Sequence, residues 1–226
     1  MSKSLHELGI LFHLTGDYES ARKLYQDSLE IKRQLGDKRG VSRSLHNLGI
    51  LALDTGDYEA ARKLYQQSLE IFSELGDRSG TSSSLHQLGW LAQATGNYDE
   101  ARKLYQQSLE IKQELGDKSG VSGSLHQQGM LAQDTGDYDE ARKLYQQSLE
   151  IFQELGDRSG ESRLLHNLGM LAQDIGDYDE ARKLYQQSLE KLGMLTQDTG
   201  DYDEARKLYQ QSLEIAQELG DKSGVS

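Results

Sequence analysis

The sequence contains no proline and no cysteine, and each absence excludes a class of structure. Proline is the strongest helix breaker, so this chain of 226 residues must end its helices with other residues, above all its 23 glycines. A chain without cysteine has no disulfide, no thiolate zinc site and no cysteine nucleophile. Because this composition fits a reducing compartment, we expect the protein to be cytoplasmic.

Long apolar runs and excess positive charge are also lacking. The first residues, MSKSLHELG, contain no apolar run of signal-peptide length, and no later run is long enough to cross a bilayer. The formal net charge of −12 repels phosphate backbones. We therefore expect neither a membrane nor a nucleic acid as a partner.

Internal repetition is the main feature of what remains. The string ARKLYQ begins at residues 21, 61, 101, 141 and 181, which sets a period of 40 residues. It begins again at residue 206, only 25 residues later. We therefore predict five repeats, the fifth shortened, and a truncated sixth repeat, with boundaries at 1–40, 41–80, 81–120, 121–160, 161–190 and 191–226.

Each period has the pattern of two helices. In the fourth repeat Leu125, Gly129 and Ala132 recur at helical spacing, as do the small and apolar residues that follow Ala141. Gly-Asp pairs separate the two halves, and glycine suits the left-handed position after a helix while aspartate suits the N-cap. The sequence therefore predicts an all-α chain of antiparallel helix pairs, each helix about 18 residues long. Such thin pairs must stack on their neighbours to bury their apolar faces.

Within this period, residues of large, small and aromatic type stand at fixed places. In the second repeat these residues are Leu45, Leu48, Gly49, Gly56, Tyr58, Ala61, Tyr65 and Ser68. The set resembles the tetratricopeptide repeat, in the long 40-residue variant found in spindle-orientation scaffolds and bacterial multi-repeat chains. It departs from the family by lacking the proline near the end of the second helix. The resemblance implies a right-handed solenoid that serves as a protein-protein interaction scaffold.

The resemblance also implies that the first helix of each repeat lines a concave groove, where a peptide or protein segment binds. The candidate ligand-binding residues, carried over position by position, are His46, Ile50, His86, Trp90, Gln93, His126, Met130, Gln133, His166, Met170 and Gln173. The second helices are nearly copied between repeats, whereas the Ile/Trp/Met position varies. We interpret this variation as a binding surface, with Trp90 as its main anchor. Random sequence change at positions where packing tolerates different side chains would produce the same pattern.

Neither a metal, a cofactor nor catalysis is expected. Equivalent histidines of stacked repeats should lie on the order of 10 Å apart, too far to share one ion. No nucleophile elbow, zincin motif or phosphate-binding loop is present. The chaperone-tail clamp that the resemblance would imply is missing too, because histidine stands where that clamp has lysine. The groove histidines instead suggest a mild pH response of ligand binding near pH 6.5.

The interval between the last two copies of ARKLYQ is too short to include the usual turn between helices. Gly169 and Gly193 are 24 residues apart where the period would put 40, and nothing in the intervening Glu190-Lys191 junction ends a helix. We predict one fused helix over about 178–199, followed by a helix over 202–219 that folds back or is exchanged between chains. The alternative function is thus a self-assembling structural module, a homodimer or larger, formed through this exchange or through open solenoid ends.

Overall fold

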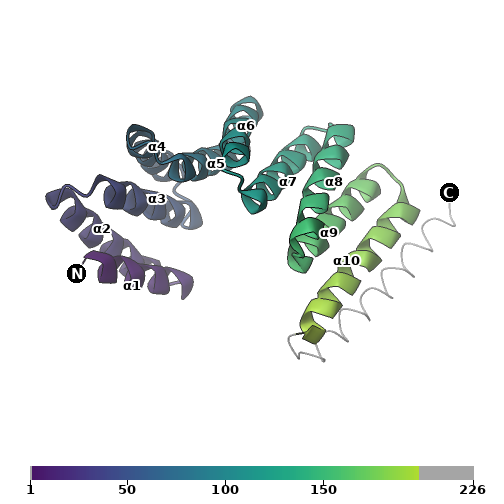
Figure 1. The fold of residues 1–226 in the computed structure, drawn as a ribbon, viewed down its shortest axis with the longest axis horizontal. Helices are drawn as coiled ribbons and strands as arrows, with labels where there is room; N and C mark the ends of the chain where they lie inside the picture. The colour runs from purple at the N-terminus through teal and green to yellow at the C-terminus, as the bar shows by residue number, and fades with distance from the viewer. Residues whose placement is uncertain (1, 199–226) are drawn as a thin grey trace. The chain divides into compact units, whose positions relative to one another are not determined.

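The computed structural model describes residues 2–198, and these residues form ten α-helices and no strand (Figure 1). The all-α prediction is confirmed. The helices are α1 (Ser2–Leu14), α2 (Tyr18–Gln34), α3 (Lys38–Asp54), α4 (Tyr58–Glu74), α5 (Arg78–Ala94), α6 (Tyr98–Glu114), α7 (Lys118–Asp134), α8 (Tyr138–Leu155), α9 (Arg158–Asp174) and α10 (Tyr178–Asp198).

The chain divides into two compact units, Met1–Gly116 and Asp117–Ser226. The first unit holds α1 to α6, and the described part of the second holds α7 to α10. We call the odd-numbered helices A-type and the even-numbered ones B-type. Within each unit every A-type helix packs on the B-type helix that follows it, and each B-type helix packs on the next A-type helix. Both units are therefore stacks of helix pairs.

The turns between helices use the predicted glycines and aspartates. Nine glycines that follow helices, among them Gly36 and Gly56, have positive φ between 63° and 83°, a region that other residues rarely adopt. The next residue caps the following helix, as where Asp37 accepts the backbone N–H of Gly40 at 2.9 Å. One cap differs, because the Asn97 side chain makes no such bond to α6. The short turns bring each helix back along the previous one.

A glycine and a tyrosine set the distance between the two helices of a pair. Gly129 of α7 lies against the ring of Tyr145 of α8, so that a Cβ at Gly129 would be 2.6 Å from the Tyr145 Cδ1 atom. The Tyr145 side chain is buried. The same contact recurs in the other pairs, between Gly9 and Tyr25, Gly49 and Tyr65, Gly89 and Tyr105, and Gly169 and Tyr185.

A buried serine fixes the register of each of four pairs. In the second unit the Ser148 hydroxyl of α8 donates to the Ser122 carbonyl oxygen of α7 at 2.8 Å. Both side chains are buried, and the bond satisfies a polar group that would otherwise cost free energy in the core. Equivalent bonds join Ser68 to Ser42, Ser108 to Ser82 and Ser188 to Ser162.

One helix spans the junction at which the repeat is shortened, as predicted. α10 runs without a break from Tyr178 to Asp198, across the Glu190-Lys191 junction. The predicted helix over 202–219 lies outside the described residues.

An ion pair joins α10 to α9 at this junction. The Lys191 ammonium lies 2.5 Å from the Glu161 carboxylate, whose side chain is 6% exposed. In the second repeat the equivalent positions hold valine and isoleucine, Val41 and Ile71, which share one apolar cluster. The fifth repeat thus replaces an apolar pair with a charged one.

A matched pair of glycine substitutions in α7 tests the helix spacing. Alanine at Gly129 would displace the buried Tyr145 ring, a strain of about 1–3 kcal/mol that we expect to exceed the gain in helix propensity. Alanine at Gly123, where a Cβ meets nothing within 4 Å, should stabilise the helix by up to about 1 kcal/mol. Urea unfolding followed by circular dichroism measures both. An equal stabilisation by the two substitutions would contradict the spacing role of Gly129.

A double-mutant cycle tests the Glu161–Lys191 pair. Lys191→Ile alone leaves a buried carboxylate without its cation and should destabilise the protein by about 3 kcal/mol. Adding Glu161→Val recreates the Val–Ile combination of the second repeat and should recover that loss or exceed it. The free energy of unfolding of the wild type, both single variants and the double variant gives the coupling. A coupling near zero would show that the two side chains do not act as a pair.

Candidate functional site

The candidate ligand-binding residues all lie on A-type helices. In the first unit α3 carries His46 and Ile50, and α5 carries His86, Trp90 and Gln93. In the second unit α7 carries His126, Met130 and Gln133, and α9 carries His166, Met170 and Gln173. In α5, α7 and α9 the three kinds of residue follow one another at intervals of about one turn, whereas α3 carries only the first two. We call these eleven residues the A-helix ladder.

The apolar members of the ladder are accessible. Ile50 and Trp90 are half-buried, whereas Met130 is 36% exposed and Met170 is 44% exposed. The A-helix leucines that form the core are different residues, such as Leu51, which is 1% exposed. Ile50 packs against the core cluster of the first unit, whereas Met130 and Met170 lie exposed beside the packing faces of α7 and α9.

The ladder histidines are held between helices. The ring centroids of His46 and Tyr65 are 5.4 Å apart, and each ladder histidine lies against the tyrosine of the following B-type helix in the same way. The Asn167 side-chain amide of α9 donates to Nε2 of His126 at 2.6 Å. His126 is 7% exposed and so offers little surface to a ligand, whereas His166 is exposed.

Burial changes how two of these histidines respond to pH. It lowers the pKa of His86 and of His126 to about 4, because the charged imidazolium is poorly solvated there. Lys112 and Arg163 respectively add a smaller repulsion. A change of ligand binding centred near pH 6.5, as the sequence suggested, is therefore not expected from these two side chains. Their titration instead affects the stability of the fold.

The ladder glutamines are fixed by the same tyrosines. The Tyr145 hydroxyl donates to Oε1 of Gln133 at 2.8 Å, and the amide nitrogen of Gln133 donates to Asp174 of α9 at 2.7 Å. Tyr105 and Tyr185 donate to Gln93 and Gln173 at 3.0 Å and 3.2 Å. Tyr105, Tyr145 and Tyr185 thus each contact a glycine, a histidine and a glutamine of the partner helix. The hydrogen bonds orient the glutamines before any ligand binds.

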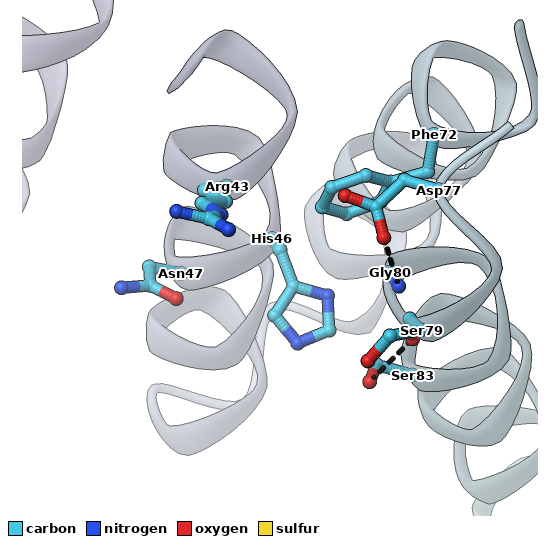
Figure 2. Close-up of a pocket in the computed structure, with 8 residues that line it drawn as sticks. All are labelled: Arg43, His46, Asn47, Phe72, Asp77, Ser79, Gly80 and Ser83. Atoms are coloured by element: carbon cyan, nitrogen blue, oxygen red, sulfur yellow. Dashed lines mark hydrogen bonds between the residues drawn. The ribbon is translucent and has the colours of Figure 1, made fainter. Parts of the chain in front are cut away.

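A cavity of about 250 Å³ lies between α3 and α5, beside the ladder residue His46. Figure 2 shows its lining, which comprises Arg43, His46, Asn47, Phe72, Asp77, Ser79, Gly80 and Ser83. In the second unit the guanidinium of Arg163 stands over the Phe152 ring, 5.6 Å from its centroid. Ser83 occupies the position equivalent to Arg163 in the first unit, and its short side chain leaves this space open.

Sequence reasoning did not find this cavity. Gly80 is part of the lining because a side chain there would collide with the buried Phe72 ring. The signal available was the exchange of arginine for serine at positions 163 and 83, which are 80 residues apart. Its meaning depends on a phenylalanine that is 11 residues away in the chain.

Other kinds of site are not visible in the part of the chain that the structure describes. There, no three histidine, aspartate or glutamate side chains gather as metal ligands. No helix within residues 2–198 combines the length and apolarity that a membrane span needs.

Sequence comparison agrees with the repeat architecture. The model of the tetratricopeptide repeat family matches residues 1–74, 40–114, 121–192 and 188–225. The chain therefore belongs to the tetratricopeptide repeat family. The curated proteins contain no sequence that matches the chain.

Solved structures share the fold at low sequence identity. A putative kinesin light chain with nearly identical repeats from Podosopora anserina is 22% identical, with a TM-score of 0.70 over 85% of this chain and 95% of that one. A signal transduction ATPase with a tetratricopeptide repeat sensor from Pyrococcus horikoshii is 18% identical, with a TM-score of 0.79 over 98% and 35%. A Rap protein complexed with competence and sporulation factor is 13% identical, with a TM-score of 0.70 over 96% and 75%.

The pKa of His126 predicts a pH-dependent stability. Because its folded-state pKa of about 4 lies below the ordinary 6.5, the unfolded chain binds this proton first as the pH falls. The folded state should lose up to about 1.4 kcal/mol per pH unit between these two values, and His126→Gln should remove that part of the slope.

Urea midpoints of the wild type and His126→Gln between about pH 7 and pH 5 measure the difference. His166→Gln, at the exposed equivalent position in α9, controls for the loss of an imidazole. Parallel pH profiles of the wild type and His126→Gln would contradict the assignment.

Proposed function

We propose that this protein is a non-enzymatic scaffold that binds a peptide or protein segment along its A-type helices. The observation that carries the proposal is the A-helix ladder, in which an accessible residue of varying apolar type stands beside prearranged polar side chains. Half-buried Trp90 and exposed Met130 and Met170 offer apolar contacts, and Gln133 offers hydrogen bonds. Tryptophan often dominates binding interfaces, and methionine adapts to differently shaped partners.

The comparisons support this proposal at the level of the fold. The tetratricopeptide repeat is generally a fold for protein interaction, and the similar Rap structure was determined as a complex with competence and sporulation factor. No catalytic role is proposed, because the ladder contains no nucleophile paired with a base. The peptide or protein segment that this chain binds would be identified by selection.

Selection from a displayed library of random peptides, followed by substitution of Trp90, tests the proposal. Peptides enriched on the wild type should bind Trp90→Ala at least about 30-fold more weakly, the loss typical of an anchor residue. Isothermal titration with a synthetic copy of the strongest peptide gives the dissociation constant for each variant.

Gln107→Ala is the matched control, because Gln107 is an exposed residue of the neighbouring helix α6 and lies outside the ladder. It should bind the peptide as the wild type does. The proposal would be contradicted if Trp90→Ala, Met130→Ala and Met170→Ala all bound the peptide with the affinity of the wild type.

A further inference from the structure

The cavity between α3 and α5 has a counterpart in the second unit, where an arginine of the chain itself takes the corresponding place. There the Arg163 guanidinium of α9 lies over the Phe152 ring of α8, 5.6 Å from its centroid. Phe152 is 3% exposed, so its ring is held in the core beneath the arginine. The second unit thus shows which kind of group this arrangement of helices accommodates, namely a planar cation over an aromatic face.

The first unit has the same ring without the arginine. Phe72, the counterpart of Phe152, is held just as firmly at 4% exposed and forms part of the lining of the cavity. Position 83 holds serine where the second unit has Arg163, and about 250 Å³ of open space adjoins the ring. Pockets for whole small molecules measure about 300–1,000 Å³, so this volume suits a single side chain.

Hydrogen-bond acceptors lie beside the ring. The Asp77 carboxylate lines the cavity, where it accepts the backbone N–H of Gly80 at 3.0 Å and pairs with Nε of Arg39 at 3.3 Å. Because a carboxylate can accept about four hydrogen bonds, it has room for a further donor. The side chains of Ser79 and Ser83 line the same cavity. A guanidinium, which has only N–H donors, would therefore find acceptors here.

Two other side chains at the cavity leave the ring face open. Burial lowers the pKa of His46, so its imidazole is uncharged at pH 7 and does not repel a cation. Arg43 is exposed, and in Figure 2 its head group lies apart from the Phe72 ring. After the effect of burial, the Arg43 charge also lowers the pKa of Lys32 and of His6, which places it toward α1 and α2. It therefore opposes a cation over the ring only from the edge of the cavity.

We propose that this cavity binds an arginine side chain of a protein segment, with the guanidinium over the Phe72 ring as Arg163 lies over Phe152. The inference rests on the proposed scaffold function for the source of the arginine, and it adds the chemistry of one contact. A cation over a single ring is a weak contact, so an isolated arginine side chain should bind with a Kd on the order of 10 mM. Such an affinity suits one side chain of a larger ligand and not a free amino acid.

Nuclear magnetic resonance of the phenylalanine rings tests the proposal in the full chain, which contains only 3 phenylalanines. The probe is N-acetyl-arginine methylamide, and its uncharged counterpart N-acetyl-citrulline methylamide is the control. The arginine probe should shift the ring signals of Phe72 and leave those of Phe12 and Phe152 in place, whereas the citrulline probe should shift none. Trp90→Ala should respond as the wild type does, because Trp90 does not line the cavity. A normal Phe72 response together with unchanged peptide affinity of the ladder variants would contradict the scaffold and support this site.

Two substitutions exchange the state of the two units. Ser83→Arg recreates the arginine–phenylalanine pair of the second unit, so it should abolish the response of Phe72 by filling the cavity. Arg163→Ser uncovers the Phe152 ring, which should then respond to the arginine probe as Phe72 does in the wild type. Circular dichroism checks that both variants keep the helical content of the wild type.

Several results would overturn the inference. One is a wild type whose Phe72 signals stay in place at probe concentrations several times the expected Kd, and another is an equal shift with the citrulline probe. A Ser83→Arg or Arg163→Ser variant that responds exactly like the wild type would overturn it as well. So would a submillimolar Kd for free L-arginine, since the ligand would then be the amino acid itself and not a side chain of a protein segment.

Discussion

The contact between a tyrosine ring and a glycine in each helix pair is the constraint on which the rest of the structure depends. Gly129 lets α7 approach Tyr145 so closely that a single added methyl group would lie 2.6 Å from the ring. This approach places the hydroxyl of Ser148 within reach of the Ser122 carbonyl, and it directs the tyrosine hydroxyl to Gln133. The distance between the two helices, their register and the orientation of Gln133 therefore all follow from this contact.

The same contact explains which positions vary between repeats. In α4, Ala61 and Tyr65 share an apolar cluster with residues of α3 and α5, and Ser68 is hydrogen-bonded to both helices, so a change at any of the three would alter both interfaces. The A-type helix has one position, held by Trp90, Met130 or Met170 in α5, α7 and α9, that these contacts leave at least partly accessible. Because close-packed interiors tolerate few changes of volume, variation gathers where packing does not oppose it. Variable and constant residues thus occupy different positions on neighbouring helices.

The sequence predicts features that depend on nearby residues, and it misses those that depend on distant ones. Gly36 and Asp37 adjoin each other, so the turn and cap could be inferred directly, and the same reasoning gave the unbroken helix α10. The tilted ring contact between His46 and Tyr65 joins residues 19 positions apart and could not be inferred from spacing. Nor could the cavity beside Phe72, since it arises from a short side chain at Ser83. The sequence shows that Glu161 stands where the second repeat has valine, but it does not show that Lys191 is the partner of Glu161.

The tyrosines also decide what the ladder histidines and glutamines can contribute. His126, which lies against the buried Tyr145 ring and accepts a hydrogen bond from Asn167, has little freedom left, and burial keeps it neutral until the pH falls toward 4. A glutamine bonded to a tyrosine hydroxyl is likewise fixed before binding, so that less side-chain entropy is lost when a ligand arrives. In the scaffold that we propose, these polar residues would set the orientation of a bound segment, whereas the accessible apolar residues would set its affinity. Such a division lets one repeated framework present isoleucine, tryptophan or methionine at the same position of its A-type helices while the tyrosine contacts beneath stay the same.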